Sequence, residues 1–183
     1  MIIGLTGSCC SGKDTVADYI RKKHGYMHLS LSDVIREMMK IAKIESTREN
    51  LIAFGTKLRR ENGNGVLAEK ILEKIDLNGK YCITSIRHPD EVKILKKIDG
   101  FVLINIDAPE DIRFERMQKR KRLGDPKTLK KFIELEEQES QIEGPGQQLS
   151  KTSNMADITL VNASNSVAKL GVAIENLLKN IEK

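Results

Sequence analysis

The chain has 183 residues, of which 39% are hydrophobic and 31% charged, and it carries a formal net charge of +5 and three cysteines. That length predicts one domain, since domains average about 150 residues, and the apolar fraction excludes a disordered chain. No apolar run approaches the roughly 18 residues of a membrane span, so we expect a protein that does not bind membranes. The odd cysteine count argues against a disulfide framework, so we expect a cytoplasmic protein.

Strand-like and helix-like segments alternate along the chain. Short apolar segments predict strands at 2–6, 27–31, 81–86, 101–106 and 158–161. Apolar residues at helical spacing predict helices at 13–23, after an N-cap at Ser32, at 48–60, at 65–75 and at 167–181. Proline in a first turn predicts further helices that open at Pro89, at Pro109 and at Asp125-Pro126. This alternation predicts an α/β sandwich with a largely parallel sheet.

A glycine-rich segment directly follows the first predicted strand and precedes a helix. It has the pattern G-x-x-x-x-G-K of a phosphate-binding (Walker A) loop, in which backbone amides converge on phosphates and the lysine reaches the β- and γ-phosphates. The sequence therefore predicts that this loop binds ATP. The residues expected to do so are Gly7, Ser8, Cys9, Cys10, Ser11, Gly12, Lys13, Asp14 and Thr15.

The position after the lysine departs from the usual motif. Asp14 stands where serine or threonine is expected to hold magnesium, and Thr15 follows it. Carboxylates suit Mg²⁺, so we expect Asp14 and Thr15 to help hold this ion, Asp14 either directly or through water. The alternative for Asp14 is an acid that only complements the dipole of the helix that begins here.

Two neighbouring cysteines lie inside the same loop. Cys9 and Cys10 precede a helix N-terminus, where a thiol pKa can fall and make the thiol sensitive to oxidation. The alternative is that both are ordinary variable positions of the loop.

Charged residues follow the second and third predicted strands, at the edge where open α/β sheets bind their ligands. Asp33 and Arg36 are three apart on one helical turn, and we expect them to orient an acceptor and its phosphate. Arg87 follows the third strand and is expected to bind phosphate. Glu91 is either a further acceptor contact or an acid that complements its helix dipole.

Nine basic residues lie between Arg113 and Lys131. Within this run Arg116, Arg120 and Arg122 are spaced so that a lid could bring their guanidinium groups over a nucleotide. The other basic residues of the run are expected to form a solvated helix face. Proteins that bind nucleic-acid strands stack bases on aromatic rings, but this chain has no Trp, four Phe and three Tyr. We therefore expect a small phosphorylated molecule as partner, and not a nucleic acid.

Six segments together resemble the nucleoside monophosphate kinase group of P-loop proteins, and within it an archaeal-type family related to dephospho-CoA kinase and adenylate kinase. The resemblance spans nearly the whole chain and is carried by residues 4–13, 32–36, 58–63, 85–92, 113–122 with 124–126, and 156–162. It implies a three-layer α/β/α P-loop NTPase fold with a five-stranded parallel sheet in one domain, residues 1–183. It also implies a helical acceptor lobe at 33–75 and a lid at 116–128.

The same resemblance implies roles for individual residues. Asp33, Arg36 and Arg87 would hold an acceptor monophosphate, with Arg59 as a further member of that site. Arg120 and Arg122 would clamp the transferring phosphate, and Asn162 would lie beside the donor base. With Lys13, the residues Arg87, Arg120 and Arg122 make the predicted catalytic set. Thr84 stands where relatives often carry an aspartate near magnesium, and it cannot supply that charge.

The predicted activity is an ATP- and Mg²⁺-dependent transfer of phosphate to a nucleoside monophosphate, by a monomer or homodimer. Two alternatives stay open. One is a dephospho-CoA kinase-like enzyme, whose acceptor is a sugar hydroxyl and whose candidate base is Asp33. The other is a nucleotide-binding regulator or slow ATPase with an RNA or protein partner.

Overall fold

The computed structural model describes residues 1–120, 125–140 and 144–181, so that Arg122 lies outside the described residues. Five strands form one sheet in the order β2-β3-β1-β4-β5, and every neighbouring pair is parallel. The strands are β1 (Ile2–Thr6), β2 (Met27–Ser30), β3 (Tyr81–Thr84), β4 (Phe101–Asp107) and β5 (Ile158–Val161). The predicted five-stranded parallel sheet is thereby confirmed.

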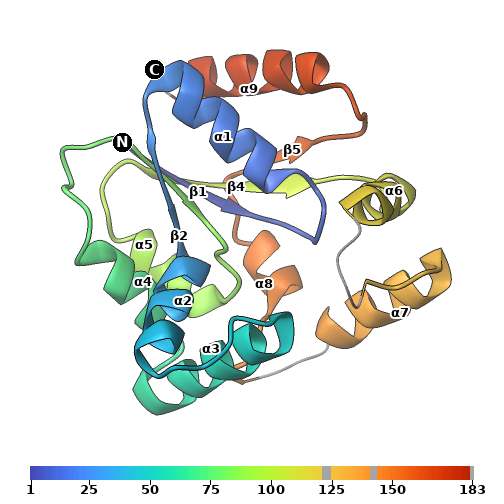
Figure 1. The fold of residues 1–183 in the computed structure, drawn as a ribbon. Helices are drawn as coiled ribbons and strands as arrows, with labels where there is room; N and C mark the ends of the chain where they lie inside the picture. The colour runs from blue at the N-terminus through green and yellow to red at the C-terminus, as the bar shows by residue number, and fades with distance from the viewer. Residues whose placement is uncertain (121–124, 141–143, 182–183) are drawn as a thin grey trace.

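Helices cover both faces of this sheet (Figure 1). One face carries α1 (Lys13–His24) and α9 (Val167–Ile181). The opposite face carries α2 (Leu31–Ile41), α3 (Arg48–Asn62), α4 (Val66–Leu72), α5 (Pro89–Leu95) and α8 (Leu149–Ser153). The remaining two described helices, α6 (Glu110–Arg120) and α7 (Leu129–Ser140), lie to one side, beyond β4 and β5 in Figure 1. Among the described residues, no helix is both long and apolar enough to cross a membrane.

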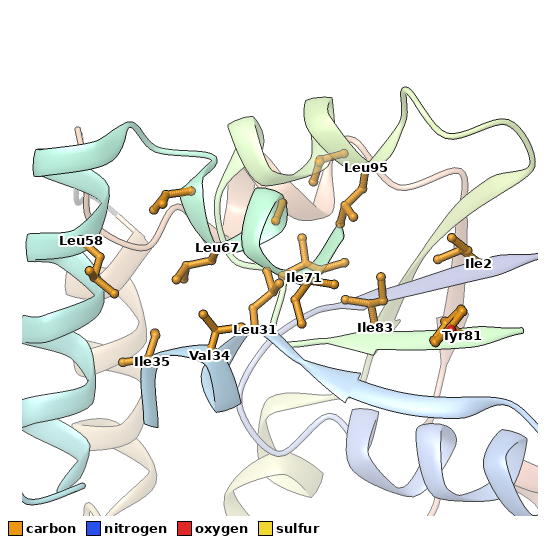
Figure 2. Packing of buried hydrophobic residues seen from close by; sticks show 14 of the residues in the cluster. Ile2, Leu31, Val34, Ile35, Leu58, Leu67, Ile71, Tyr81, Ile83 and Leu95 are labelled. Atoms are coloured by element: carbon orange, nitrogen blue, oxygen red, sulfur yellow. The ribbon is translucent and has the colours of Figure 1, made fainter. Parts of the chain in front are cut away.

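The sheet separates two hydrophobic cores, because successive strand residues point to opposite faces. Ile2 packs with the α2–α5 side, shown in Figure 2, whereas its neighbour Ile3 packs with α1 and α9. Both side chains are at most 1% exposed. A strand buried on both faces reads as a continuous apolar run, which is why residues 2–5 show no polar alternation.

Two predicted boundaries near the carboxyl edge of the sheet are wrong. Strand β3 ends at Thr84 and not at residue 86, because Ser85 adopts a left-handed conformation with φ of 62°. Helix α2 begins at Leu31, one residue before the predicted cap, because the Ser30 hydroxyl accepts the bond from the Ser32 amide. Both differences bring serine side chains to the edge of the sheet.

The second half of the chain also differs from the prediction in two places. Helix α7 begins at Leu129 and not at Asp125-Pro126, and the Thr128 hydroxyl accepts a bond from the Lys131 amide in its first turn. The short helix α8 was not predicted. Its five residues are too few to show a helical apolar period.

Candidate active site

All five strands are parallel, so the segments that follow them meet at one edge of the sheet. The glycine-rich loop, residues 7–12, follows β1 and leads into α1. The start of α2 follows β2, and residues 85–88 follow β3. The segment from Asn162 follows β5. The fold thus collects most of the predicted site residues from segments that are far apart in the chain.

The loop curls because three of its residues have positive φ: Gly7 at 125°, Cys10 at 60° and Gly12 at 108°. A Cβ on Gly7 would lie 2.1 Å from the Ile106 carbonyl oxygen, so only glycine fits against β4 here. Gly12 is the N-cap of α1, and within the described residues no side chain caps this helix. The first amides of α1, with the positive end of the helix dipole, are therefore available to an anion.

Lys13 folds back over this loop. Its Nζ donates to the carbonyl oxygens of Gly7 at 2.8 Å and Ser8 at 2.6 Å. Burial, together with the nearby positive charge of Arg87, lowers the pKa of Lys13 to about 8. Nζ also lies 3.5 Å from the Ser11 hydroxyl oxygen, so that the contacts given for this ammonium group are neutral oxygen atoms of the loop. Its surroundings disfavour its charge, and a phosphate would supply a counter-charge.

The predicted magnesium ligands lie at the open end of α1. Asp14 and Thr15 are both exposed on its first turn, and their oxygen atoms are of the kind that Mg²⁺ prefers. Thr84 is buried, and its hydroxyl lies 2.9 Å from His28 Nε2. In the described part of the chain, no group of three or more His, Cys, Asp or Glu side chains is placed to hold a metal ion. The oxygen atoms of Asp14 and Thr15 are chemically suited to Mg²⁺, and their role as its ligands stays a prediction.

Arg116 ties the back of the loop to the segment after β5. Its Nη1 donates to the carbonyls of Cys10 at 3.3 Å and Ser11 at 3.1 Å, and its Nη2 to those of Asn162 at 3.0 Å and Ser164 at 2.9 Å. Asn162 Nδ2 also donates to the Ser11 carbonyl, at 2.8 Å. Both residues thus touch the predicted ATP loop, and here they support its backbone. Their contacts with a nucleotide stay a prediction.

Arg120 lies over the loop at the end of α6. Its guanidinium bonds both carboxylate oxygens of Asp125, at 2.9 and 2.8 Å, and its Nη1 lies 3.7 Å from Cys9 Sγ. The fold therefore brings this predicted lid arginine to the phosphate-binding loop, while Arg122 cannot be placed. Elsewhere in the basic run, Arg113 is buried and paired with Glu136.

The predicted acceptor residues lie where α2 begins. Arg36 Nη1 donates to Asp33 Oδ1 at 2.8 Å, and both side chains are exposed. Beside them, the Ser30 hydroxyl lies 2.9 Å from the hydroxyls of Ser32 and Ser85. The start of α2 therefore offers a cation, a carboxylate and a set of hydroxyls within one small region.

Behind this region lies a buried ion pair. Arg59 Nε and Nη2 donate to Glu91 Oε1 at 3.0 and 2.8 Å, and the two side chains are 4% and 0% exposed. Glu91 Oε2 accepts from the amides of Arg87 at 2.8 Å and His88 at 3.0 Å. Glu91 and Arg59 do not face the open edge in this structure. They instead fix the backbone that carries Arg87.

Three contacts between residues 87–88 and residues 144–148 were not predicted. Arg87 Nη1 donates to Gln147 Oε1 at 3.0 Å, and the Arg87 carbonyl accepts from the Gln148 amide at 2.8 Å. His88 Nε2 lies 3.0 Å from the Gly144 carbonyl. The Gly-Pro-Gly pattern at 144–146 indicates a loop, but no feature of the sequence shows that this loop packs against residues 87–88.

Comparisons of the sequence with known proteins place the chain among relatives. The AAA domain family matches residues 6–134. A UPF0200 protein of Sulfurisphaera tokodaii is 31% identical over 180 residues, which cover 98% of this chain and 97% of that protein. A UPF0200/UPF0201 protein of Archaeoglobus fulgidus is 34% identical over 190 residues, which cover 99% of this chain but only 57% of that longer protein.

Solved structures are similar in fold at low identity. A shikimate kinase of Bacteroides thetaiotaomicron superposes with a TM-score of 0.65 at 14% identity, covering 100% of this chain and 99% of the other. A gluconokinase of Sinorhizobium meliloti gives 0.56 at 16% identity, covering 98% and 94%. The fold is thus that of P-loop kinases.

Proposed function

The chain belongs to the UPF0200 family and carries an AAA domain, and on that premise we propose that it is an ATP- and Mg²⁺-dependent phosphotransferase. We propose a small phosphorylated molecule as acceptor, with a nucleoside monophosphate as the first candidate. The P-loop kinase fold and the site at the carboxyl edge of its sheet support the proposal.

One observation carries it. Lys13 and Arg87 lie on the segments that follow the neighbouring strands β1 and β3, and the charge of Arg87, together with burial, lowers the pKa of Lys13 to about 8. Two cations this close repel one another unless anions lie between or beside them. Such a pair suits a reaction in which donor phosphates bind on the Lys13 side and an acceptor phosphate binds on the Arg87 side.

On the donor side, Lys13 would exchange the carbonyls of Gly7 and Ser8 for the donor's phosphates. The uncapped amides of α1 would bind the same phosphates, and Asp14 and Thr15 would offer oxygen atoms to the ion. Mg²⁺, when bound, would neutralise phosphate charge. Arg116 and Asn162 would keep the loop in shape from behind.

On the acceptor side, Arg36 and Arg87 would fix the acceptor phosphate near the donor. Arg120, which already lies at the loop beside Cys9, would stabilise charge on the group in transfer. A phosphate acceptor is already ionised at neutral pH, so that this chain needs no general base for it. The same residues would exclude water and so limit hydrolysis of the donor.

A hydroxyl acceptor is the second candidate, and Asp33 favours it. The Asp33 carboxylate is exposed beside the hydroxyls of Ser30, Ser32 and Ser85, where it would accept a proton from an attacking hydroxyl. Dephospho-CoA and sugar acids belong to this class, and the solved structures with the same fold include a shikimate kinase and a gluconokinase.

A panel assay with labelled ATP separates these possibilities. We expect label to appear on one nucleoside monophosphate, and not on dephospho-CoA, shikimate or gluconate. Arg87→Ala should raise the KM of the acceptor about tenfold or more and leave the Kd of ATP nearly unchanged. Hydrolysis alone, together with RNA binding that weakens steeply with salt, would instead indicate a regulator.

Asp33→Asn tests the second candidate directly. A general base contributes about 10²–10⁴-fold to rate, so that this variant would lose most of its kcat if the acceptor is a hydroxyl. With a phosphate acceptor we expect a change in KM, because Asp33 then only positions Arg36.

A further inference from the structure

Two cysteines of the phosphate-binding loop are expected to bind ATP through their backbone, but their thiol groups have no role in the proposed transfer. Cys9 and Cys10 are neighbours between Ser8 and Ser11, and their Sγ atoms lie 3.8 Å apart. We propose that they are a modification site: a hydroperoxide joins them in a reversible disulfide, which switches off nucleotide binding by the loop. This inference rests on the nucleotide binding proposed above.

The geometry is close to what the bond requires. Both side chains are half-buried, so that a small oxidant can reach them, and the sulfur atoms need to approach by roughly 1.8 Å to reach the disulfide length of about 2.05 Å. Cys10 has a φ of 60°, a conformation that non-glycine residues adopt only when their surroundings impose it. The loop thus holds the two thiols in contact before any reaction.

The surroundings divide the roles of the two thiols. Arg120 Nη1 lies 3.7 Å from Cys9 Sγ, and a guanidinium at this distance favours the thiolate, which is the nucleophile. The hydrogen bond with Cys9, together with burial, raises the pKa of the Cys10 thiol. Cys9 is therefore the sulfur that reacts first, and Cys10 the one that resolves the product.

The third cysteine differs in every respect. Cys82 lies inside β3 with 0% exposure, and burial raises its pKa to about 12. A buried thiol of this kind is unreactive. It is therefore a control for oxidation within the same chain.

The chemistry balances with a hydroperoxide as oxidant. The Cys9 thiolate attacks the outer peroxide oxygen, which breaks the O–O bond, gives a sulfenic acid and releases hydroxide or an alkoxide. The Cys10 sulfur then attacks Cys9 Sγ, loses its proton and expels hydroxide, which leaves as water. Two electrons pass from the two thiols to the peroxide, and a dithiol reductant reverses the step by exchange.

The disulfide would change the part of the loop that binds phosphate. A bond between neighbouring residues closes a small ring through their shared peptide unit, so that the amide of Cys10, which lies in this ring, must turn. It would also move the Cys10 carbonyl, which accepts from Arg116 at 3.3 Å. Because the ring is strained, we expect a bond that dithiols reduce readily, as is typical of regulatory disulfides.

The test compares reduced and peroxide-treated full-length protein. Peptide mapping by mass spectrometry should find the peptide of Cys9 and Cys10 lighter by two hydrogen atoms, and Cys82 unchanged. Calorimetry should give a Kd for MgATP at least tenfold higher after oxidation, and dithiothreitol should restore the starting value. Prior addition of MgATP should slow the oxidation, because bound phosphates cover the loop.

Two variants test the roles of the individual cysteines, and each oxidised variant is compared with its own reduced form. Cys10→Ser should stop at a sulfenic acid that dimedone traps at Cys9, whereas Cys82→Ala should oxidise like the wild type. The proposal is overturned if oxidation joins two chains, reaches Cys82 first, or leaves the Kd for MgATP unchanged. If the reduced protein does not bind MgATP at all, the proposed function fails, which is a separate result.

Discussion

The buried pair between Glu91 and Arg59 gives the most quantitative prediction. In Glu91→Gln the side chain keeps its shape but loses its charge and one acceptor oxygen. The amide can accept from Arg59 or from the amides of Arg87 and His88, but its NH₂ group must then face the other set of donors. The change therefore leaves a buried guanidinium or two buried backbone amides without acceptors.

The structure sets the size of this effect. The two side chains are 4% and 0% exposed, so that solvent does not compensate for the loss. Breaking a buried pair by removing one partner costs about 3–5 kcal/mol. For a domain of this size each kcal/mol lowers Tm by about 2–4 °C, so that we expect Tm to fall by about 6–20 °C. Urea denaturation followed by circular dichroism measures the free energy of unfolding.

Asp90→Asn is the matched control, one residue away on the same helix. Asp90 pairs with Lys93 at the surface and is 36% exposed, so that its loss should cost less than about 1 kcal/mol. If Glu91→Gln is as stable as this control, the pair does not hold the Arg87 segment and the reasoning is refuted.

Two further predictions concern the phosphate-binding loop. The pKa of Lys13 is about 8, and bound phosphate favours its ammonium form. The Kd for MgATP should therefore stay level below pH 8 and rise above pH 8 by up to about tenfold per pH unit. Titration calorimetry across this pH range measures the Kd, and a level pH profile that Lys13→Met does not alter would contradict the prediction. In Gly12→Ala the new Cβ would lie 2.4 Å from Asn162 Nδ2 at a φ of 108°, so that MgATP binding should be lost. At Gly25 the φ is 71°, and among the described residues no heavy atom beyond its chain neighbours lies within 4 Å of a new Cβ. Gly25→Ala should therefore cost only about 1 kcal/mol in stability and keep MgATP binding.

Local patterns predicted most of the fold. Buried parallel strands read as apolar runs, and α9 shows its apolar face at helical spacing over 15 residues. The boundaries failed where a side chain competes with the backbone pattern, as with Ser30, which caps α2 in place of the predicted Ser32. Helix α8 was not predicted because its five residues are too few to show a helical spacing of apolar side chains.

The site was predictable where its residues are contiguous. The loop at 7–13 forms one motif, whereas Arg59 and Glu91 are 32 positions apart and meet only in the folded chain. Gln147 lies 60 positions from Arg87, with no pattern that links them. Spacing placed Arg116 at the loop but could not show that it would bind carbonyls there, because that depends on the direction of each peptide unit.

Binding of a bisubstrate analogue tests the central claim most directly. In such an analogue a polyphosphate joins the donor nucleoside to the acceptor nucleoside, so that it spans the sites of Lys13 and Arg87 together. The proposed function predicts a Kd about 100-fold or more below that of ATP, and Arg87→Ala should remove most of this gain. An analogue that binds no tighter than ATP, with no effect of Arg87→Ala, would contradict a phosphotransferase that holds donor and acceptor phosphates side by side.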